Sequence, residues 1–253
     1  MTWLLLSVAG AGVGLMFGAF GAGGSAFATP VLVLLGVPAP IAIASPLPAM
    51  LPASLAGARQ YVRAGHLDRR IAKLAVLAGL PAVVAGAAFS RLVGGSSLVV
   101  LSGLMLFVVG VRMAWPSASL DSVDALAVSG EREARGDLLV VGLVAGAGFL
   151  TGLLANGGGF LLVPIFVLVL GLTAVQAAGT SMVAVAALIV PTLLAHIWLG
   201  HVDWAVAAAF AAGVIPASIV GARIGQRLPE VFARRAFGVV LVTFSVCFLA
   251  LRA

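Results

Sequence analysis

The sequence predicts an all-α, polytopic membrane protein made of two repeats with inverted topology. Its composition, its series of apolar stretches and an internal duplication each point this way. Of the 253 residues, 62% are hydrophobic and only 9% are charged. A soluble domain carries about 25% charged residues. A soluble chain with so few charges would expose apolar patches larger than monomers tolerate, so we expect this chain to lie in a lipid bilayer.

The apolar stretches form two sets of five, one on each side of a polar segment. The first set lies at about 3–20, 26–36, 38–57, 71–90 and 97–114. The second set lies near 138–155, 160–171, 174–199, 202–222 and 236–251. We therefore expect a first transmembrane repeat over 1–115, a polar inter-repeat loop over 116–136 and a second transmembrane repeat over 137–253.

A residue register supports the duplication. With an offset of 134, Gly18 aligns with Gly152 and Pro30 aligns with Pro164. With an offset of 135, the Gly-His-x-Asp tetrad at 65–68 aligns with the tetrad at 200–203. Chance matches of Ala, Leu and Gly are common in such a composition. A proline pair and a tetrad that align in the same order, with one residue gained between them, indicate an internal repeat.

Basic residues predict that the two repeats have opposite orientations. The connection between the third and fourth stretches is basic in the first half, whereas its counterpart around 200–203 contains no Lys or Arg. The next connection is basic in the second half instead. The residues concerned are Arg59, Arg63, Arg69, Arg70 and Lys73 in the first half, and Arg223, Arg227, Arg234 and Arg235 in the second. Because Lys and Arg mark cytoplasmic loops, equivalent connections face opposite sides, with both termini outside.

The second stretch of each half is short and follows a glycine cluster. Residues 26–36 and 160–171 are too few to cross about 30 Å of hydrocarbon. Non-helical backbone is tolerated at membrane depth where protein or a water-filled cavity covers it. The free N–H groups at the start of a half-helix attract anions. Broken helices in two inverted halves are typical of a secondary transporter site, although close helix contact through small residues is the alternative explanation of the glycines.

The polar residues of the apolar stretches favour an anion as substrate. Apart from Asp203, at the very start of the stretch 202–222, no Asp or Glu lies in an apolar stretch. The carboxylate relay common in proton pumps and cation carriers is therefore missing. An anion needs N–H and O–H donors, which glycine backbone, hydroxyls and amides supply. The substrate-binding residues that we expect are Gly21, Gly23, Gly24, Ser25, Ser45, Asn156, Gly157, Gly158, Gly159, Gln176, Thr180 and Ser181.

The histidines and one arginine need separate interpretations. His196 lies within the apolar run 193–199 and is a candidate for proton coupling; an interfacial histidine bonded to a neighbouring helix is the alternative. His66 and His201 each precede an Asp by two residues, and turn and helix-cap chemistry explains that pattern. Arg223 is either a vestibule residue or an interfacial anchor.

The glycine motifs resemble those of a known family. The run Gly21-Ala22-Gly23-Gly24 with Pro30, and the run Asn156-Gly157-Gly158-Gly159 with Pro164, are similar to the glycine motif of the sulfite exporter family named after TauE and SafE. Residues 171–181 and the tetrad at 200–203 also resemble that family. The resemblance implies a small bacterial membrane transporter of sulfur-containing anions and organosulfonates.

The two halves depart from each other at the motif positions. The first half has Ser45-Pro46 where the second has Thr180-Ser181, and Ala22 where the second has Asn156. A substrate site assembled from both halves would therefore take its hydroxyl and amide donors mainly from the second half.

The sequence thus predicts a secondary transporter of the bacterial inner membrane that moves a small anion, sulfite or an organosulfonate, out of the cell. An anion channel and another small-anion importer of the same architecture remain alternatives. We expect no catalytic residues, no metal, no cofactor and no nucleic-acid partner. The expected partners are the anion, the lipid bilayer and a proton or ion gradient.

Overall fold

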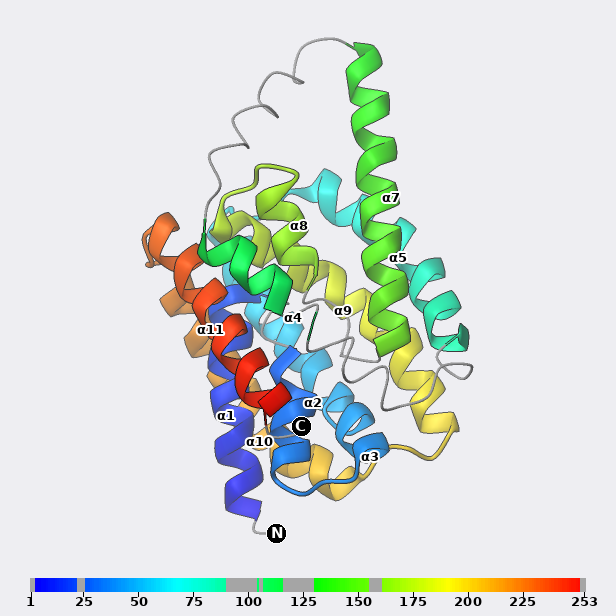
Figure 1. Cartoon of the computed structure of the whole chain (residues 1–253), viewed down its shortest axis with the longest axis vertical. Helices are drawn as coiled ribbons and strands as arrows, with labels where there is room; N and C mark the ends of the chain where they lie inside the picture. The colour runs from blue at the N-terminus through cyan, green and yellow to red at the C-terminus, as the bar shows by residue number, and fades with distance from the viewer. Residues whose placement is uncertain are drawn as a thin grey trace.

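The computed structural model describes residues 3–21, 26–89, 104, 107–115, 130–154 and 161–250 (Figure 1). Every regular element in these ranges is a helix, which confirms the all-α prediction. The helices are α1 (Trp3–Phe20), α2 (Ala28–Leu34), α3 (Ala39–Ala44), α4 (Leu47–Arg63), α5 (Arg69–Phe89), α7 (Gly130–Leu154), α8 (Leu162–Leu168), α9 (Ala174–Trp198), α10 (Trp204–Gly225) and α11 (Glu230–Ala250).

Several of these helices are long and apolar enough to cross a membrane, as the sequence predicts for a polytopic protein. Five such segments occur within the described residues. They are Trp3–Phe20, Pro40–Arg63, Arg69–Phe89, Ala174–Trp198 and Trp204–Gly225.

Two of the apolar stretches form helices that are too short to span a bilayer. Helices α2 and α8 have 7 residues each, about 10 Å at 1.5 Å per residue. Each is followed by a glycine with positive φ, Gly36 at +84° and Gly171 at +66°. Figure 1 places α2 toward the end of the bundle where the chain begins and α8 toward the opposite end.

The structure differs from the expected inter-repeat loop. Residues 116–129 lie outside the described part of the chain, but α7 already begins at Gly130, inside the segment 116–136. Part of the segment that we expected to be a loop is therefore helical.

The third stretch is broken in the first half and continuous in the second. Helices α3 and α4 are separated at Ser45 and Pro46, whereas α9 runs unbroken for 25 residues through the equivalent Thr180 and Ser181. Proline has no N–H with which to continue the hydrogen-bond ladder. Ser181 has one, so the second-half helix continues.

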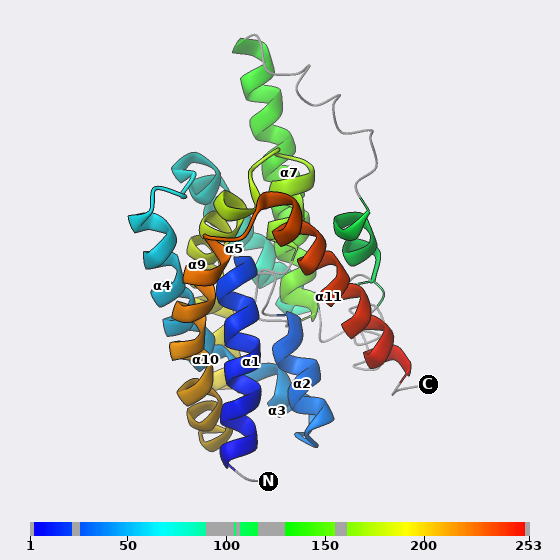
Figure 2. The ribbon, with the colours of Figure 1, turned by 90° about the vertical axis from the view of Figure 1, so that its left-hand side faces the viewer.

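Helices α1 and α10 come from different halves and lie side by side (Figure 2). The contact runs through glycines: a Cβ on Gly14 would lie 2.5 Å from the carbonyl oxygen of Val214, and one on Gly18 would overlap the backbone of Ser218. Glycines of α10 approach α1 in the same way, as Gly221 does at Leu15. Since residue numbers rise together along both helices, α1 and α10 run parallel.

Helices α5 and α7 form the matching pair, again with one helix from each half (Figure 1). A Cβ on Gly148 would lie 3.0 Å from the carbonyl oxygen of Gly79, and one on Gly152 would overlap the backbone of Val83. Because Gly152 aligns with Gly18, the two pairs use the same close contact. Small residues allow such approach between membrane helices.

The Gly-His-x-Asp tetrads stop one helix and start the next. Gly65 and Gly200 have φ values of +79° and +68°. The following histidines, His66 and His201, donate backbone N–H groups to the carbonyls five residues earlier, over 2.9 and 3.1 Å. This is the bond that closes a helix C-terminus around a left-handed glycine.

The aspartates of the tetrads cap the next helix. Asp68 Oδ1 accepts from the N–H of Ile71 at 2.9 Å. Asp203 Oδ1 accepts from the N–H groups of Ala205 and Val206 at 2.8 and 3.0 Å. The expectation of turn and cap chemistry is confirmed, and a side-chain oxygen in this position stabilises a helix start.

Helices α4 and α9 are equivalent in the two halves but run in opposite directions. A Cβ on Gly57 would meet the Met182 side chain, and one on Gly179 would lie 2.7 Å from Tyr61 Cβ. Residue numbers therefore rise along α4 while they fall along α9. The end of α4 meets the start of α9. After each of these helices, the tight turn at Gly65 or Gly200 reverses the chain into the next helix.

These directions give the bundle two chemically different ends. At one end α1 and α10 start and α9 stops; we call it the tryptophan end, since it holds exposed tryptophans. They are Trp3, Trp198 and Trp204. The opposite end holds the basic connections of both halves and is called the basic end. Its residues are Arg59, Arg63, Arg69, Arg70, Lys73, Arg223, Arg227, Arg234 and Arg235.

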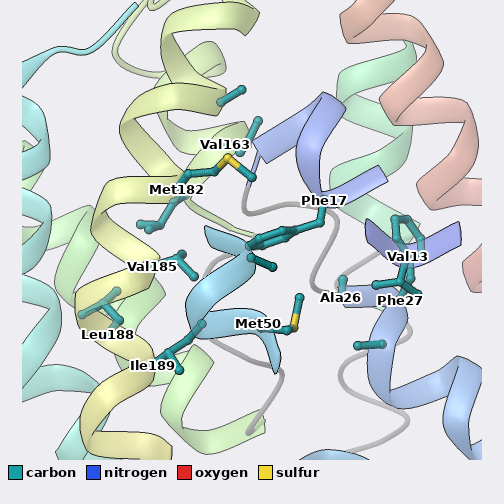
Figure 3. Packing of buried hydrophobic residues seen from close by; sticks show 14 of the residues in the cluster. Val13, Phe17, Ala26, Phe27, Met50, Val163, Met182, Val185, Leu188 and Ile189 are labelled. Atoms are coloured by element: carbon teal, nitrogen blue, oxygen red, sulfur yellow. The ribbon is translucent and has the colours of Figure 1, made fainter. Parts of the chain in front are cut away.

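The centre of the bundle is an apolar core shared by both halves. Phe17 and Met50 come from the first half, and Met182 and Ile189 come from α9 (Figure 3). All four side chains are buried. A core built across the halves requires both halves to fold together.

We expect Gly14→Val to destabilise the protein, because a Cβ cannot fit against the α10 backbone. Overpacking of this kind costs roughly 1–3 kcal/mol. Thermal unfolding of detergent-solubilised protein measures the loss. Gly12→Val is the matched control, since Gly12 lies on the same helix and a Cβ there would have nothing within 4 Å of it. Equal losses for both variants would contradict the close contact.

Candidate functional site

The structure describes five of the residues expected to bind substrate, together with His196. The five are Gly21, Ser45, Gln176, Thr180 and Ser181. The remaining candidates lie outside the described residues. They are Gly23, Gly24, Ser25, Asn156, Gly157, Gly158 and Gly159.

The first glycine break lies directly against the second half. Gly21 follows α1 with a φ of +73°. A Cβ on Gly21 would lie 2.5 Å from Ala178 Cα and 2.7 Å from Ser181 Oγ, both on α9. Glycine alone combines the left-handed backbone with this approach. The structure therefore brings together two of the predicted site residues from opposite halves.

Ser181 is fully buried beside this break. Its hydroxyl donates to the carbonyl of Ala178 at 3.0 Å, within α9. A hydroxyl group can donate one hydrogen bond and accept others. Ser181 thus places an adaptable polar group where the first glycine break meets α9.

Ser45 and Thr180 make reciprocal hydrogen bonds between the halves. Ser45 Oγ accepts from the backbone N–H of Asp203 at 3.0 Å. Thr180 Oγ1 accepts from the backbone N–H of Asp68 at 3.1 Å. Both hydroxyls are fully buried. The two bonds are equivalent under the repeat register, and each joins the third stretch of one half to the helix turn of the other.

The structure does not bring Ser45 and Thr180 together. Ser45 lies near the tryptophan end and Thr180 near the basic end. Gly57 and Met182 stand at one level, and counting residues from them at 1.5 Å per residue separates the two hydroxyls by about 20 Å. These two candidates therefore lie along the length of the bundle and cannot contact one small anion at once.

Gln176 caps the start of α9 at the protein surface. Its side-chain oxygen accepts from the N–H of Thr173 at 3.3 Å, and the Thr173 hydroxyl accepts from the N–H of Gln176 at 3.2 Å. This reciprocal pair is a capping box. Glu230 Oε1 also accepts from the N–H of Ala174 at 2.7 Å. Side chains of the protein thus satisfy several free N–H groups at this helix start.

Sequence reasoning missed Tyr61, which joins the helices around the first break. Its hydroxyl donates to the carbonyl oxygen of Gly18 at 2.8 Å and lies 3.2 Å from that of Ala19. The side chain is fully buried. Two signals could have identified it: Tyr61 is the only tyrosine of the chain, and it aligns with His196 at the offset of 135.

His196 pairs with the histidine of its own turn. Its Nδ1 lies 3.2 Å from Nδ1 of His201, so one imidazole donates and the other accepts. His196 is half-buried near the tryptophan end. We considered a hydrogen bond from His196 to a neighbouring helix. The structure instead shows a hydrogen bond to His201, in the turn that follows α9.

The arginines lie at the basic end, where two cases can be separated. Arg223 is exposed, which fits an interfacial anchor rather than a vestibule residue. Arg234 is half-buried and lines a small cavity with Phe20, Val175 and Gly225. That cavity measures about 10 Å³, enough for about one water molecule.

A larger cavity opens at the tryptophan end. It measures about 260 Å³ and lies between the start of α1, the α2–α3 connection and the start of α10. Its lining residues are Trp3, Leu6, Gly36, Val37, Pro38, Ile41, Asp203, Ala205 and Val206. The lining is mostly apolar. Asp203, one of the lining residues, donates its backbone N–H to the Ser45 hydroxyl.

The model of the sulfite exporter TauE/SafE family matches residues 6–248. The chain belongs to the TauE/SafE family. This match confirms the resemblance seen in the glycine motifs and the prediction of a membrane transporter. Membership of a transporter family also fits the expectation that the chain is not an enzyme.

Two relatives extend over almost the whole chain. A probable membrane transporter protein of Xylella fastidiosa (strain 9a5c) is 27% identical over 248 residues, which cover 96% of this chain and 94% of the relative. The probable membrane transporter protein of strain Temecula1 / ATCC 700964 gives the same identity and coverage. No solved structure matches the chain significantly. Together with the apolar helices, these relatives identify a multi-pass protein of the bacterial inner membrane.

We expect Thr180→Val to destabilise the protein, because the N–H of Asp68 loses its acceptor in a buried place. An unsatisfied buried donor costs about 1–3 kcal/mol. Thr180→Ser keeps the hydroxyl and is the matched control. Thermal unfolding in detergent compares them, and Ser45→Ala should add its own loss independently since the sites are far apart. A Thr180→Ser protein as unstable as Thr180→Val would contradict the role of this bond.

Proposed function

We propose that this membrane transporter moves a small oxidised sulfur anion, sulfite or an organosulfonate, out of the cell. The family to which the chain belongs is described as sulfite exporters. The observation that carries the proposal is the contact of the Gly21 break with the buried Ser181 of the other half. A glycine break against a polar group at the interface of two repeats is the arrangement of many transporter sites.

The chemistry of the available donors favours an anion over a cation. Ser181 contributes a hydroxyl group beside the first break, and Thr180 precedes it on α9. The Thr180 hydroxyl oxygen accepts a hydrogen bond from the backbone N–H of Asp68. The hydrogen of the same hydroxyl can donate a second hydrogen bond. Asn156 and the glycines of both clusters complete the proposed site. Hydrogen bonds to a charged partner are stronger than those between neutral groups, which suits a desolvated anion.

Ser45 and Gln176 are proposed to act at other depths of the same path. Ser45 lies near the tryptophan end, beside the cavity lined by Asp203. Gln176 lies exposed at the basic end. An anion that crosses the bundle would meet these groups before or after the central site.

We propose that the repeats have inverted topology. Support comes from α4 and α9, which are equivalent and antiparallel, and from the parallel pairs α1 with α10 and α5 with α7. It follows that α1 and α7, also equivalent, run in opposite directions. The gathering of basic residues from both halves at one end supports a cytoplasmic basic end.

A channel and an importer of the same architecture are the other candidate functions. A channel conducts without alternating access and gives no counterflow, whereas a carrier exchanges labelled for unlabelled substrate. Direction is decided by loading the anion on one side of the membrane only.

We expect single cysteines near Arg69 and near Arg234 to be protected from a membrane-impermeant thiol reagent added outside intact cells. A cysteine near Gly200 should react, because it lies at the tryptophan end. Cys247 is first replaced by Ser. If positions 69 and 201 report the same side, the inverted topology is wrong.

We expect Asn156→Ala and Ser181→Ala each to weaken the apparent affinity for sulfite about ten- to a hundredfold. This is the factor for about 1.5–3 kcal/mol, the contribution of a hydrogen bond to a charged group. Uptake of labelled sulfite into proteoliposomes, with and without a pH gradient, measures it. Unchanged affinity in both variants would remove the anion site from this region.

The same assay tests proton coupling through His196. If that residue carries the proton, His196→Gln should flatten the pH dependence of transport while the affinity for sulfite stays nearly constant. His66→Gln is the control, because His66 occupies the turn at the basic end. A pH profile that is flat in the unaltered protein would exclude coupling through His196.

A further inference from the structure

Tyr61 and His196 stand at equivalent places in the two halves. They are related by the offset of 135. Each carbonyl accepts the N–H of the histidine five residues later, and each is followed after four residues by a glycine with positive φ, Gly65 or Gly200. The backbone around the two side chains is therefore the same. Any difference between them lies in the side chains and their contacts.

Tyr61 ties four helices together at the basic end. From α4 it reaches the last carbonyls of α1, at Gly18 and Ala19. A Cβ added to Gly179 of α9 would lie 2.7 Å from the Tyr61 Cβ. A Cβ added to Gly225 of α10 would lie 2.7 Å from the Tyr61 hydroxyl. The side chain is 0% exposed. Tyr61 thus fills the junction of α1, α4, α9 and α10.

His196 makes no such junction at the tryptophan end among the residues that the structure describes. Its ring is bonded to His201 in the turn that follows its own helix. The positions of α7 equivalent to Gly18 and Ala19 are Gly152 and Leu153. The neighbours Leu194 and Trp198 are 61% and 87% exposed. The contact described for the His196 side chain is thus made within its own turn, whereas Tyr61 bonds to another helix.

The two ends of the bundle also differ in their cavities. The cavity beside Ala19 and Gly225 at the basic end measures about 10 Å³. The cavity beside Val37 and Asp203 at the tryptophan end measures about 260 Å³. The small cavity adjoins Ala19, whose carbonyl lies 3.2 Å from the Tyr61 hydroxyl. The larger cavity lies between α1, the α2–α3 connection and α10, at the same end of the bundle as His196 but not against that side chain.

We propose that Tyr61 is the closed gate of the basic end and that His196 is its counterpart, which closes the tryptophan end in the alternate state. In that state His196 leaves His201 and bonds to the carbonyls of Gly152 and Leu153, while Tyr61 releases those of Gly18 and Ala19. Two halves with the same backbone scaffold can exchange their conformations, and this exchange moves the opening from one end to the other. The inference rests on the proposed transport function and adds its gating residues.

The first test measures the reactivity of a central cysteine from each end. Met182→Cys is placed in a Cys247→Ser background, because Met182 is buried in the shared core (Figure 3). Inside-out and right-side-out vesicles are treated with a membrane-impermeant thiol reagent. Adding Tyr61→Phe should speed labelling from the basic end about tenfold, the factor for one lost hydrogen bond. Ser54→Ala is the matched control, since its buried hydroxyl bonds to Leu51 within α4.

The second test gives the tryptophan end its own tyrosine and does not depend on changing Tyr61. His196→Tyr should reach the carbonyl of Gly152 and slow labelling of the cysteine introduced by Met182→Cys from the tryptophan end about tenfold. Equal labelling rates for Tyr61→Phe and Ser54→Ala, or an unchanged rate for His196→Tyr, would overturn the gating proposal. Labelling needs no substrate, so the two proposals can fail separately. A protein that shows these labelling rates but does not transport labelled sulfite would contradict the substrate assignment and still support the gating proposal.

Discussion

The close contact between helices of different halves is the constraint on which the rest of the structure depends. Lipid tails are as apolar as leucine, so membrane helices associate through close van der Waals contact rather than through exclusion from water. Gly14 and Gly18 bring α1 against the backbone of α10, and Gly148 and Gly152 bring α7 against α5. Each pair takes one helix from each half. The halves therefore interleave, and neither can form its close contacts alone.

This interleaving also places the polar groups. Thr180 holds the turn at Asp68, and Ser45 holds the turn at Asp203, so each half positions a helix start of the other. The centre between them is apolar, while Ser181 stands at its edge beside Gly21. The basic side chains stay at the end of the bundle. In the function that we propose, a path of neutral donors would hold the anion strongly enough to replace its hydration and weakly enough to release it, as permeation requires.

Much of the fold follows from local sequence patterns. The apolar stretches gave the long helices, the short stretches gave α2 and α8, and the tetrads gave a helix stop, a turn and a cap. Tyr61 escaped notice because an aromatic residue in an apolar helix normally indicates a core position. Its hydroxyl is bonded to carbonyls more than 40 residues away. Nothing in the sequence around Tyr61 identifies those carbonyls as its partners.

The sequence by itself determined that the chain is a membrane protein, where most of its helices run and which residues of the two halves correspond. These properties depend on composition, length and register, which are read along the chain. Only the tertiary structure decided that Gly21 meets Ser181 while Ser45 and Thr180 stand about 20 Å apart at 1.5 Å per helical residue. The physical reason is that depth in the bundle depends on helix direction, which contacts between residues more than 100 positions apart establish.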